Sequence, residues 1–221
     1  MATTASIDFG RIKLMNKKMK YTVYGYIRKY EKIYSINAPI GIINLCLLFY
    51  AIIQEWDIKY LHENIKIDGD KVTQIHDGRH GNAYLKGTVK SGINRWKFKI
   101  TNCQHYNAGY MLIGIRRIDN TKQPPLGDTF FTNAQRRKAC GYAFIPNDGK
   151  LTSVDSGGSG GKYGVKCQNH DIVEMNLDLN KLSLSYIINN KDYGKAFDVE
   201  YGEYKVAIWM WYKGSSITLQ C

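Results

Sequence analysis

A serine flanked by glycines is the first pattern in this chain that could do chemistry. Residues 157–161 spell the G-x-S-x-G motif, in which hydrolases present a nucleophilic serine, here Ser159. Such a serine needs a strand before it and a helix after it, so that the sharp turn exposes its hydroxyl. A polar turn precedes this stretch and residues 162–164 lead towards another strand. We therefore expect a flexible hairpin loop without a nucleophile.

Two other groups have the residue types of metal or acid–base sites. His76 and His80 are four residues apart, which would place two imidazoles on one side of a helix for zinc. Neighbouring glycines disfavour that helix, and no third ligand is nearby. Glu174 and Asp178 could form a carboxylate pair, but strand alternation places both on a solvated face, where they stay ordinary acids. The sequence predicts no metal site, no cofactor and no catalytic residue.

The segment 141–145 (Gly-Tyr-Ala-Phe-Ile) matches the centre of the octamer found in RNA-recognition motifs. Its flanks depart from that signature, because Cys140 replaces a basic residue and Asn147 replaces the final aromatic residue. The RNA-binding fold also packs helices on one face of its sheet, and no helical pattern is present here. We expect instead a strand that directs Tyr142 and Phe144 into a core.

Alternation of apolar and polar residues is the main signal in the C-terminal two-thirds of the chain. Trp96, Phe98 and Ile100 face one way while basic side chains face the other, the pattern of a strand with one buried face. The same alternation, or a wholly apolar run, recurs at 110–115, 173–179, 182–188 and 206–212. No helical stripe interrupts residues 71–220. These features predict an all-β, antiparallel sandwich or barrel.

The first 60 residues differ from the rest in charge and periodicity. Residues 1–34 hold eight basic and two acidic side chains, and so half of the net charge of +12. Helical spacing predicts a short helix near residues 23–34 and a strongly apolar one over 39–53, whose first turn accepts Pro39. The apolar helix must be covered by its neighbour, by the β-domain or by a partner. The expected domains are a flexible basic arm (1–20), a helical hairpin (21–60) and a β-sandwich (61–221).

The cysteines and the apolar runs indicate in which part of the cell the protein is expected. The five cysteines are odd in number and form no C-x-x-C pair, which favours free thiols inside the cell over a disulfide framework. The apolar run 40–53 is shorter than the ~17 residues that a membrane span needs. The N-terminus lacks the apolar stretch of a signal peptide. We expect a soluble protein of the cytoplasm or nucleus.

The order of the strand motifs between Lys71 and Gln220 resembles that of SPRY domains. The segment 92–100 resembles the family's glycine followed by an aromatic strand, and 113–115 matches the apolar-Gly-apolar core of the next strand. Further motifs follow in the family's order at 141–144, 162–164, 171–173, 177–179, 182–186 and 194–197. Tyr186 stands where Phe is usual, and Asn190 where a turn glycine is usual. The resemblance implies a bent sandwich of two antiparallel sheets that binds peptides or folded proteins and does not catalyse.

The resemblance also implies a binding surface. In some SPRY domains it includes the loop before an Asp-Gly turn and a Trp in or after the penultimate strand, which residues 76–78 and Trp211 match. Aromatic side chains at a loop edge are common anchors of interfaces, although they could equally pack internally. The residues expected to contact a partner are Asp77, Arg79, Phe130, Trp211 and Tyr212. Recognition subunits of ubiquitin ligases and signalling scaffolds are the assemblies that the resemblance suggests.

The basic charge supports an alternative function, the binding of RNA or another anionic surface. Cationic segments attract phosphates without sequence specificity and in a salt-dependent way. The residues expected to form this patch are Arg11, Lys13, Lys17, Lys18, Lys20, Arg28, Lys29, Arg136, Arg137 and Lys138. A protein-interaction module is our first hypothesis and an RNA-binding protein the second.

Overall fold

The computed structural model describes residues 54–77, 80–103, 111–118, 141–153 and 161–220. The chain divides into two compact units, Met1–Ala51 and Ile52–Cys221, and all described residues lie in the second. Its described elements are a 3-10 helix η2 (Ile58–Tyr60) and the strands β1 (Ile65–Asp68), β2 (Lys71–Gln74), β3 (Gly81–Tyr84), β4 (Ile93–Asn102), β5 (Met111–Arg117), β6 (Gly141–Ile145), β7 (Lys150–Ser153), β8 (Ile172–Asp178), β9 (Ser183–Ile188), β10 (Lys191–Asp198), β11 (Tyr204–Met210) and β12 (Ser216–Gln220).

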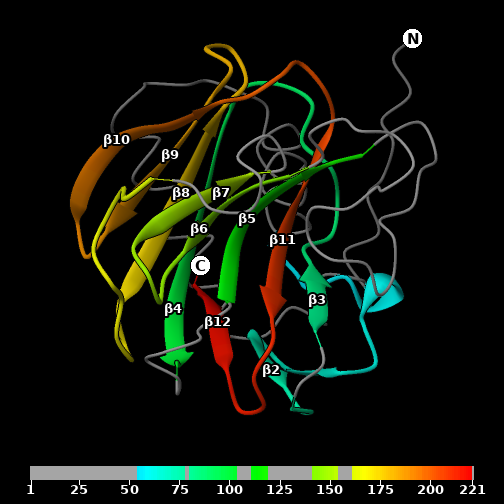
Figure 1. The fold of residues 1–221 in the computed structure, drawn as a ribbon. Helices are drawn as coiled ribbons and strands as arrows, with labels where there is room; N and C mark the ends of the chain where they lie inside the picture. Colours follow the sequence, from blue (N-terminus) through cyan, green and yellow to red (C-terminus); the bar gives the residue numbers. More distant parts are fainter. Residues whose placement is uncertain (1–53, 78–79, 104–110, 119–140, 154–160, 221) are drawn as a thin grey trace, which may run out of the picture. The chain divides into compact units, whose positions relative to one another are not determined.

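The strands form two antiparallel sheets (Figure 1). The seven-stranded sheet has the order β1-β2-β12-β4-β8-β9-β10, and the five-stranded sheet has the order β3-β11-β5-β6-β7. The last strand in sequence, β12, lies between β2 and β4 and pairs with both. This architecture confirms the predicted two-sheet antiparallel β-sandwich.

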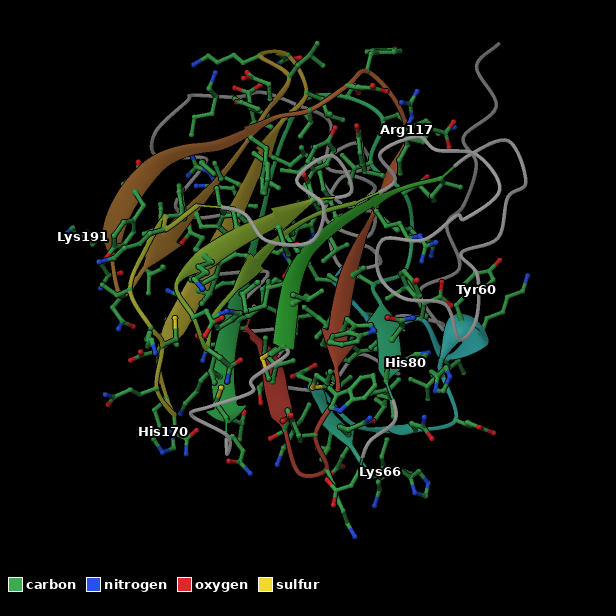
Figure 2. All side chains as sticks on the ribbon, viewed as in Figure 1. Tyr60, Lys66, His80, Arg117, His170 and Lys191 are labelled. Atoms are coloured by element: carbon green, nitrogen blue, oxygen red, sulfur yellow. The ribbon has the colours of Figure 1, made fainter. Side chains whose placement is uncertain are left out.

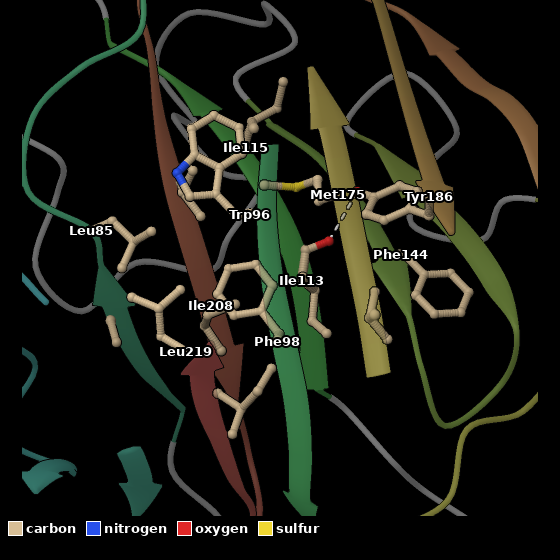
Figure 3. Packing of buried hydrophobic residues seen from close by; sticks show 14 of the residues in the cluster. Leu85, Trp96, Phe98, Ile113, Ile115, Phe144, Met175, Tyr186, Ile208 and Leu219 are labelled. Atoms are coloured by element: carbon tan, nitrogen blue, oxygen red, sulfur yellow. Dashed lines mark hydrogen bonds between the residues drawn. The ribbon is translucent and has the colours of Figure 1, made fainter. Parts of the chain in front are cut away.

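The main core lies between the two sheets. Trp96, Phe98 and Ile100 of β4 are at most 2% exposed, as their alternation predicts. They belong to one cluster with Ile113 of β5 and Ile208 of β11, from the facing sheet (Figure 3). Burying a side chain of this size contributes about 1.5–3 kcal/mol. Alternation along β4 is therefore what fixes the inner face of the seven-stranded sheet.

The five-stranded sheet is buried on its outer face as well, as the apolar runs in β5 and β11 predict. A second cluster on that face consists of Tyr84, Leu112, Ala143, Ile145, Ala207 and Trp209. Gly114 lies among them, and a Cβ atom there would collide with the carbonyl oxygen of Tyr142. Only glycine lets β5 and β6 approach this closely at that position.

The hairpin between β9 and β10 turns at Asn189 and Asn190, whose φ angles are +49° and +66°. Asparagine tolerates this left-handed conformation better than other non-glycine residues do. The next two residues, Lys191 and Asp192, already belong to β10. Asparagine thus replaces the glycine that is usual in this turn without changing the hairpin.

Several predictions fall on residues outside the described part of the chain. These are the basic arm, both predicted helices and the G-x-S-x-G stretch except for Gly161. Of the expected hairpin region, residues 54–60 are described, and they pack with the sandwich. Trp56 forms a β-bridge with Leu85, is 5% exposed and donates from its indole to the Asp70 carbonyl at 2.8 Å.

Candidate functional site

The C-terminal end of β11 positions two tryptophans on the outer side of the five-stranded sheet. Trp209 lies in the strand opposite Asn82 of β3 and Leu112 of β5, and it is 8% exposed. Trp211 is the first residue after the strand and is half-buried against the outer cluster. Large rings two residues apart share one side of a strand. The strand therefore buries one indole and leaves the second partly accessible beside it.

Two histidines complete an aromatic group that we name the Trp211 cluster: His62, His80, Trp209 and Trp211. The His80 ring stacks on Trp209, with centroids 6.3 Å apart and planes 13° apart, and on Trp211 at 5.9 Å and 30°. The centroid of the His62 ring lies 6.0 Å from that of His80, with the two planes 48° apart. Figure 2 labels His80 at the beginning of β3. The cluster joins residues from three distant parts of the sequence.

The surroundings of the cluster shift the pKa of His62. Burial is the main cause that lowers the pKa of His62 below its usual 6.5, and the nearby His80 lowers it further, while Glu63 opposes both. The Nδ1 atom of His62 also accepts a hydrogen bond from the Asn64 amide at 3.1 Å, and a proton on Nδ1 would abolish that bond. The neutral form of His62 therefore suits this site.

The loop that follows Trp211 is held by the end of β2 and the residues just after it. The backbone N–H of Gln74 donates to the Ser215 carbonyl at 2.9 Å, and the backbone carbonyl of Gln74 accepts from the Gly214 amide at 2.7 Å. The Asp77 carboxylate accepts from the Lys213 amide at 3.0 Å. These bonds bring together residues 136 positions apart and hold the backbone of residues 213–215 in place.

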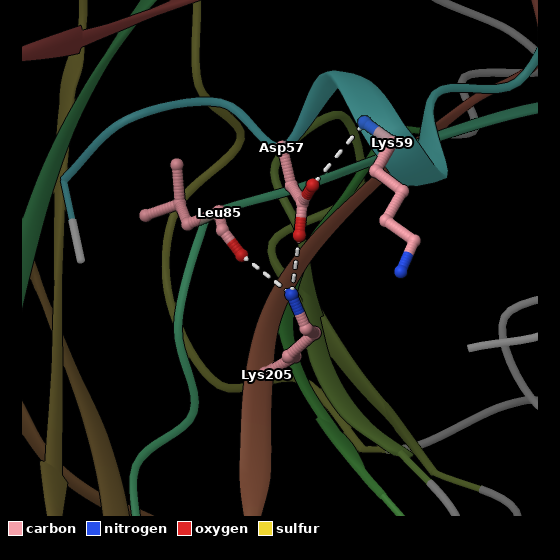
Figure 4. A network of polar contacts seen from close by, with 4 residues as sticks. All are labelled: Asp57, Lys59, Leu85 and Lys205. Atoms are coloured by element: carbon pink, nitrogen blue, oxygen red, sulfur yellow. Dashed lines mark hydrogen bonds and ion pairs between the residues drawn. The ribbon is translucent and has the colours of Figure 1, made fainter. Parts of the chain in front are cut away.

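An ion pair holds η2 on the same face. Lys205 Nζ lies 2.6 Å from Asp57 Oδ2 and donates to the Leu85 carbonyl at 3.2 Å (Figure 4). The other oxygen of Asp57 accepts from the Lys59 amide at 3.2 Å. The same ammonium lies 5.1 Å from the centre of the Tyr60 ring, within cation–π range. Tyr60 packs against the outer cluster, as Trp211 does.

The structure brings together three of the five residues expected to contact a partner. Asp77, Trp211 and Tyr212 lie at one loop junction, where Tyr212 is half-buried and Asp77 is exposed. Arg79 and Phe130 lie outside the described residues. All ten residues of the expected basic patch also lie outside them: Arg11, Lys13, Lys17, Lys18, Lys20, Arg28, Lys29, Arg136, Arg137 and Lys138.

Sequence reasoning missed His62 and His80 as parts of this site. It considered His80 only with His76, as a zinc pair, whereas the His80 ring lies against two tryptophans. In the described ranges, no group of three or more His, Cys, Asp or Glu side chains is placed to hold a metal ion. No spacing in the sequence links His80 to Trp211, because the pairing of β3 with β11 brings the two residues together.

The other patterns lie where strand alternation places them. Tyr142 and Phe144 of β6 are at most 6% exposed and belong to the main core, as predicted. Glu174 and Asp178 are half-buried on the outer side of β8. Asp178 accepts hydrogen bonds from the amides of Asn180 and Lys181, at 3.0 and 3.1 Å, and so supports the turn between β8 and β9. The structural role of Asp178 is therefore in the hairpin.

Several solved structures have folds similar to this one. No family model and no curated protein matches the chain. The SPRY domain of human HERC1 is similar with a TM-score of 0.56 and 18% identity, covering 74% of this chain and 96% of that one. The TRIM65 PSpry domain is similar with a TM-score of 0.53 and 12% identity, covering 80% and 99%. The NEUZ (NHR) domain in Neuralized from Drosophila melanogaster has a TM-score of 0.50 and 13% identity, covering 75% and 90%.

These likenesses and the strand order define the described residues as a SPRY-type β-sandwich. The predicted SPRY resemblance is therefore confirmed at the level of the fold. Among the described residues, no helix has the length and apolar character needed to cross a membrane.

Proposed function

We propose that this chain is a non-catalytic protein-interaction module that binds a peptide or protein at the Trp211 cluster. The observation that carries the proposal is the half-buried Trp211 ring, which lies beside His80 at the edge of the sandwich. Tryptophan and tyrosine are enriched among residues that dominate binding energy, because they bury a large area and lose little side-chain entropy. Tyr212 is the second anchor.

Rigidity around the cluster supports this assignment. Hydrogen bonds with the Gln74 backbone and with the Asp77 carboxylate fix the loop 211–215, and the Asp57–Lys205 pair fixes η2. A surface that is ordered before binding loses less entropy when a partner docks. We further propose that the module serves as a recognition subunit or scaffold in a ubiquitin-ligase or signalling assembly, as SPRY domains often do. The SPRY-type fold supports that role.

Affinity purification of full-length protein from its native cell tests the binding site. We expect Trp211→Ala to lose at least about tenfold of the partner signal, since removal of an interface anchor costs roughly 2 kcal/mol or more. Tyr201→Ala is the matched control, because Tyr201 is 75% exposed and precedes the opposite end of β11. Circular dichroism of both variants must show intact sheets. Equal partner capture by both folded variants would refute the Trp211 cluster as the site.

A further inference from the structure

The outer face of the seven-stranded sheet carries a group of cations that the proposed function does not use. Along β4, Arg95, Lys97 and Lys99 point away from the core, opposite the buried Trp96, Phe98 and Ile100. Thr218 of β12 pairs with Lys99 on one side and with Lys71 of β2 on the other. We name these four cations, Lys71, Arg95, Lys97 and Lys99, the basic strip.

No cation of the basic strip forms an ion pair within 4 Å among the described residues. The ion pairs among the described residues use Lys86, Lys90, Arg117, Lys150, Lys195 and Lys205. Glu174 is the cross-strand partner of Lys97, and Asp68 is the partner of Lys71, but neither comes within 4 Å of a cation of the strip. Like charges on alternate positions of one strand repel each other, and only two cross-strand acids, Glu174 and Asp68, face the four cations of the strip.

The spacing of the strip matches that of an extended polypeptide. Side chains at alternate positions of a strand are roughly 6.6–6.8 Å apart, and strands two positions apart are roughly 9.5 Å apart. An extended chain with acids at alternate positions therefore presents carboxylates at the same interval as Arg95, Lys97 and Lys99. Arginine can bind a carboxylate through two parallel hydrogen bonds.

The remaining side chains on this face favour a polypeptide over a nucleic acid. Thr73, Thr101, Thr218 and Gln220 surround the strip, and the hydroxyls of Thr101 and Thr218 are 2.7 Å apart. Proteins that bind single-stranded nucleic acid combine cations with aromatic rings on which bases stack. The outward-facing residues of β2, β4 and β12 include no aromatic side chain.

We propose that the basic strip binds an extended acidic polypeptide whose carboxylates occupy alternate positions. The Trp211 cluster follows a strand of the other sheet, so this second surface does not depend on the proposed function. A module with both surfaces could hold two partners, or two segments of one partner.

Fluorescence anisotropy with full-length protein tests the proposal. The probe is a labelled heptapeptide in which three glutamates alternate with serines. We expect Lys97→Glu/Lys99→Glu to weaken its binding by at least about tenfold, because two attractive contacts become repulsive. Lys166→Glu/Lys181→Glu is the matched control, since both lysines are exposed outside the strip and the change in net charge is the same. The control variant should bind within about threefold of wild type.

Three results would overturn the proposal. The first is no wild-type binding at low ionic strength. The second is an equal loss in both double variants, which would show that only net charge matters. The third is that a single-stranded RNA heptamer binds more tightly than the peptide, and that the Lys97→Glu/Lys99→Glu variant abolishes this RNA binding while the control variant does not. Trp211→Ala must leave peptide affinity unchanged, and Lys97→Gln/Lys99→Gln replaces the charge-reversal variant if that variant does not fold.

Discussion

Lys205 and Asp57 form a nearly buried ion pair between residues that are 148 positions apart in the sequence. Their side chains are 8% and 13% exposed. Loss of one partner from such a pair is costly, because the other charge remains buried without compensation. The pair therefore couples η2 to β11 and, through Tyr60, to the outer cluster.

Replacing one partner of this pair should destabilise the sandwich strongly. For Asp57→Asn, we expect the free energy of unfolding to fall by about 3 kcal/mol or more, since the buried ammonium loses its counter-charge. Urea denaturation measures the change. The control is Lys195→Ala, which removes a pair with Asp198 whose side chains are 57% and 80% exposed, and it should cost less than about 1 kcal/mol. Equal losses would contradict the structural role of Lys205.

Stability should depend on pH through His62. Because the pKa of His62 in the folded state is below the unfolded value of 6.5, the unfolded chain binds the proton more tightly. The stability contributed by neutral His62 is therefore fully present above pH 6.5 and is lost as the pH falls through the lowered pKa. Thermal unfolding between pH 7.5 and 5 should show a smaller decrease in Tm for His62→Gln than for wild type.

The same electrostatics predict a change in the titration of His62 itself. His80→Gln removes a charge that lowers the pKa of His62, so that pKa should rise. Titration followed by NMR measures it. An unchanged pKa in the folded variant would show that burial acts alone.

The two turn asparagines should respond differently to glycine. Asn189 Oδ1 accepts from the Ile172 amide at 2.9 Å, and its Nδ2 donates to Asp171 at 2.9 Å, so Asn189→Gly should cost about 1–2 kcal/mol. Asn190→Gly should be neutral or stabilising by up to about 1 kcal/mol, because glycine adopts its φ of +66° without strain. Chemical denaturation of the two variants checks the order, and a reversed order would contradict the turn geometry.

The hydroxyl of Tyr186 should stabilise the fold. The phenylalanine that is usual at this position in SPRY domains lacks that hydroxyl. The hydroxyl donates to the Ile113 carbonyl at 3.0 Å and so links the two sheets. Tyr186→Phe should lower the free energy of unfolding by about 1 kcal/mol, while Tyr193→Phe, a half-buried control in β10, should change it little. Burial raises the pKa of Tyr186 well above its usual value. Its ultraviolet titration should therefore be delayed until the protein unfolds.

Local alternation made most of the described fold predictable. The buried face of β4 follows from Trp96, Phe98 and Ile100, because a period of two needs no knowledge of the partner strand. The Asp57–Lys205 pair and the contact between His80 and Trp211 could not be predicted, since both depend on which strands pair and in what register. Trp211 was found through resemblance, and its contact with a partner stays a prediction.

The position of β12 between β2 and β4 has a consequence during synthesis. Until residues 216–220 leave the ribosome, β2 and β4 in the nascent chain each keep one row of backbone amides and carbonyls without a strand beside it. Open strand edges of this kind recruit other chains and cause aggregation. The sandwich can close only after its last strand emerges, so we expect the growing polypeptide to need chaperone protection until then.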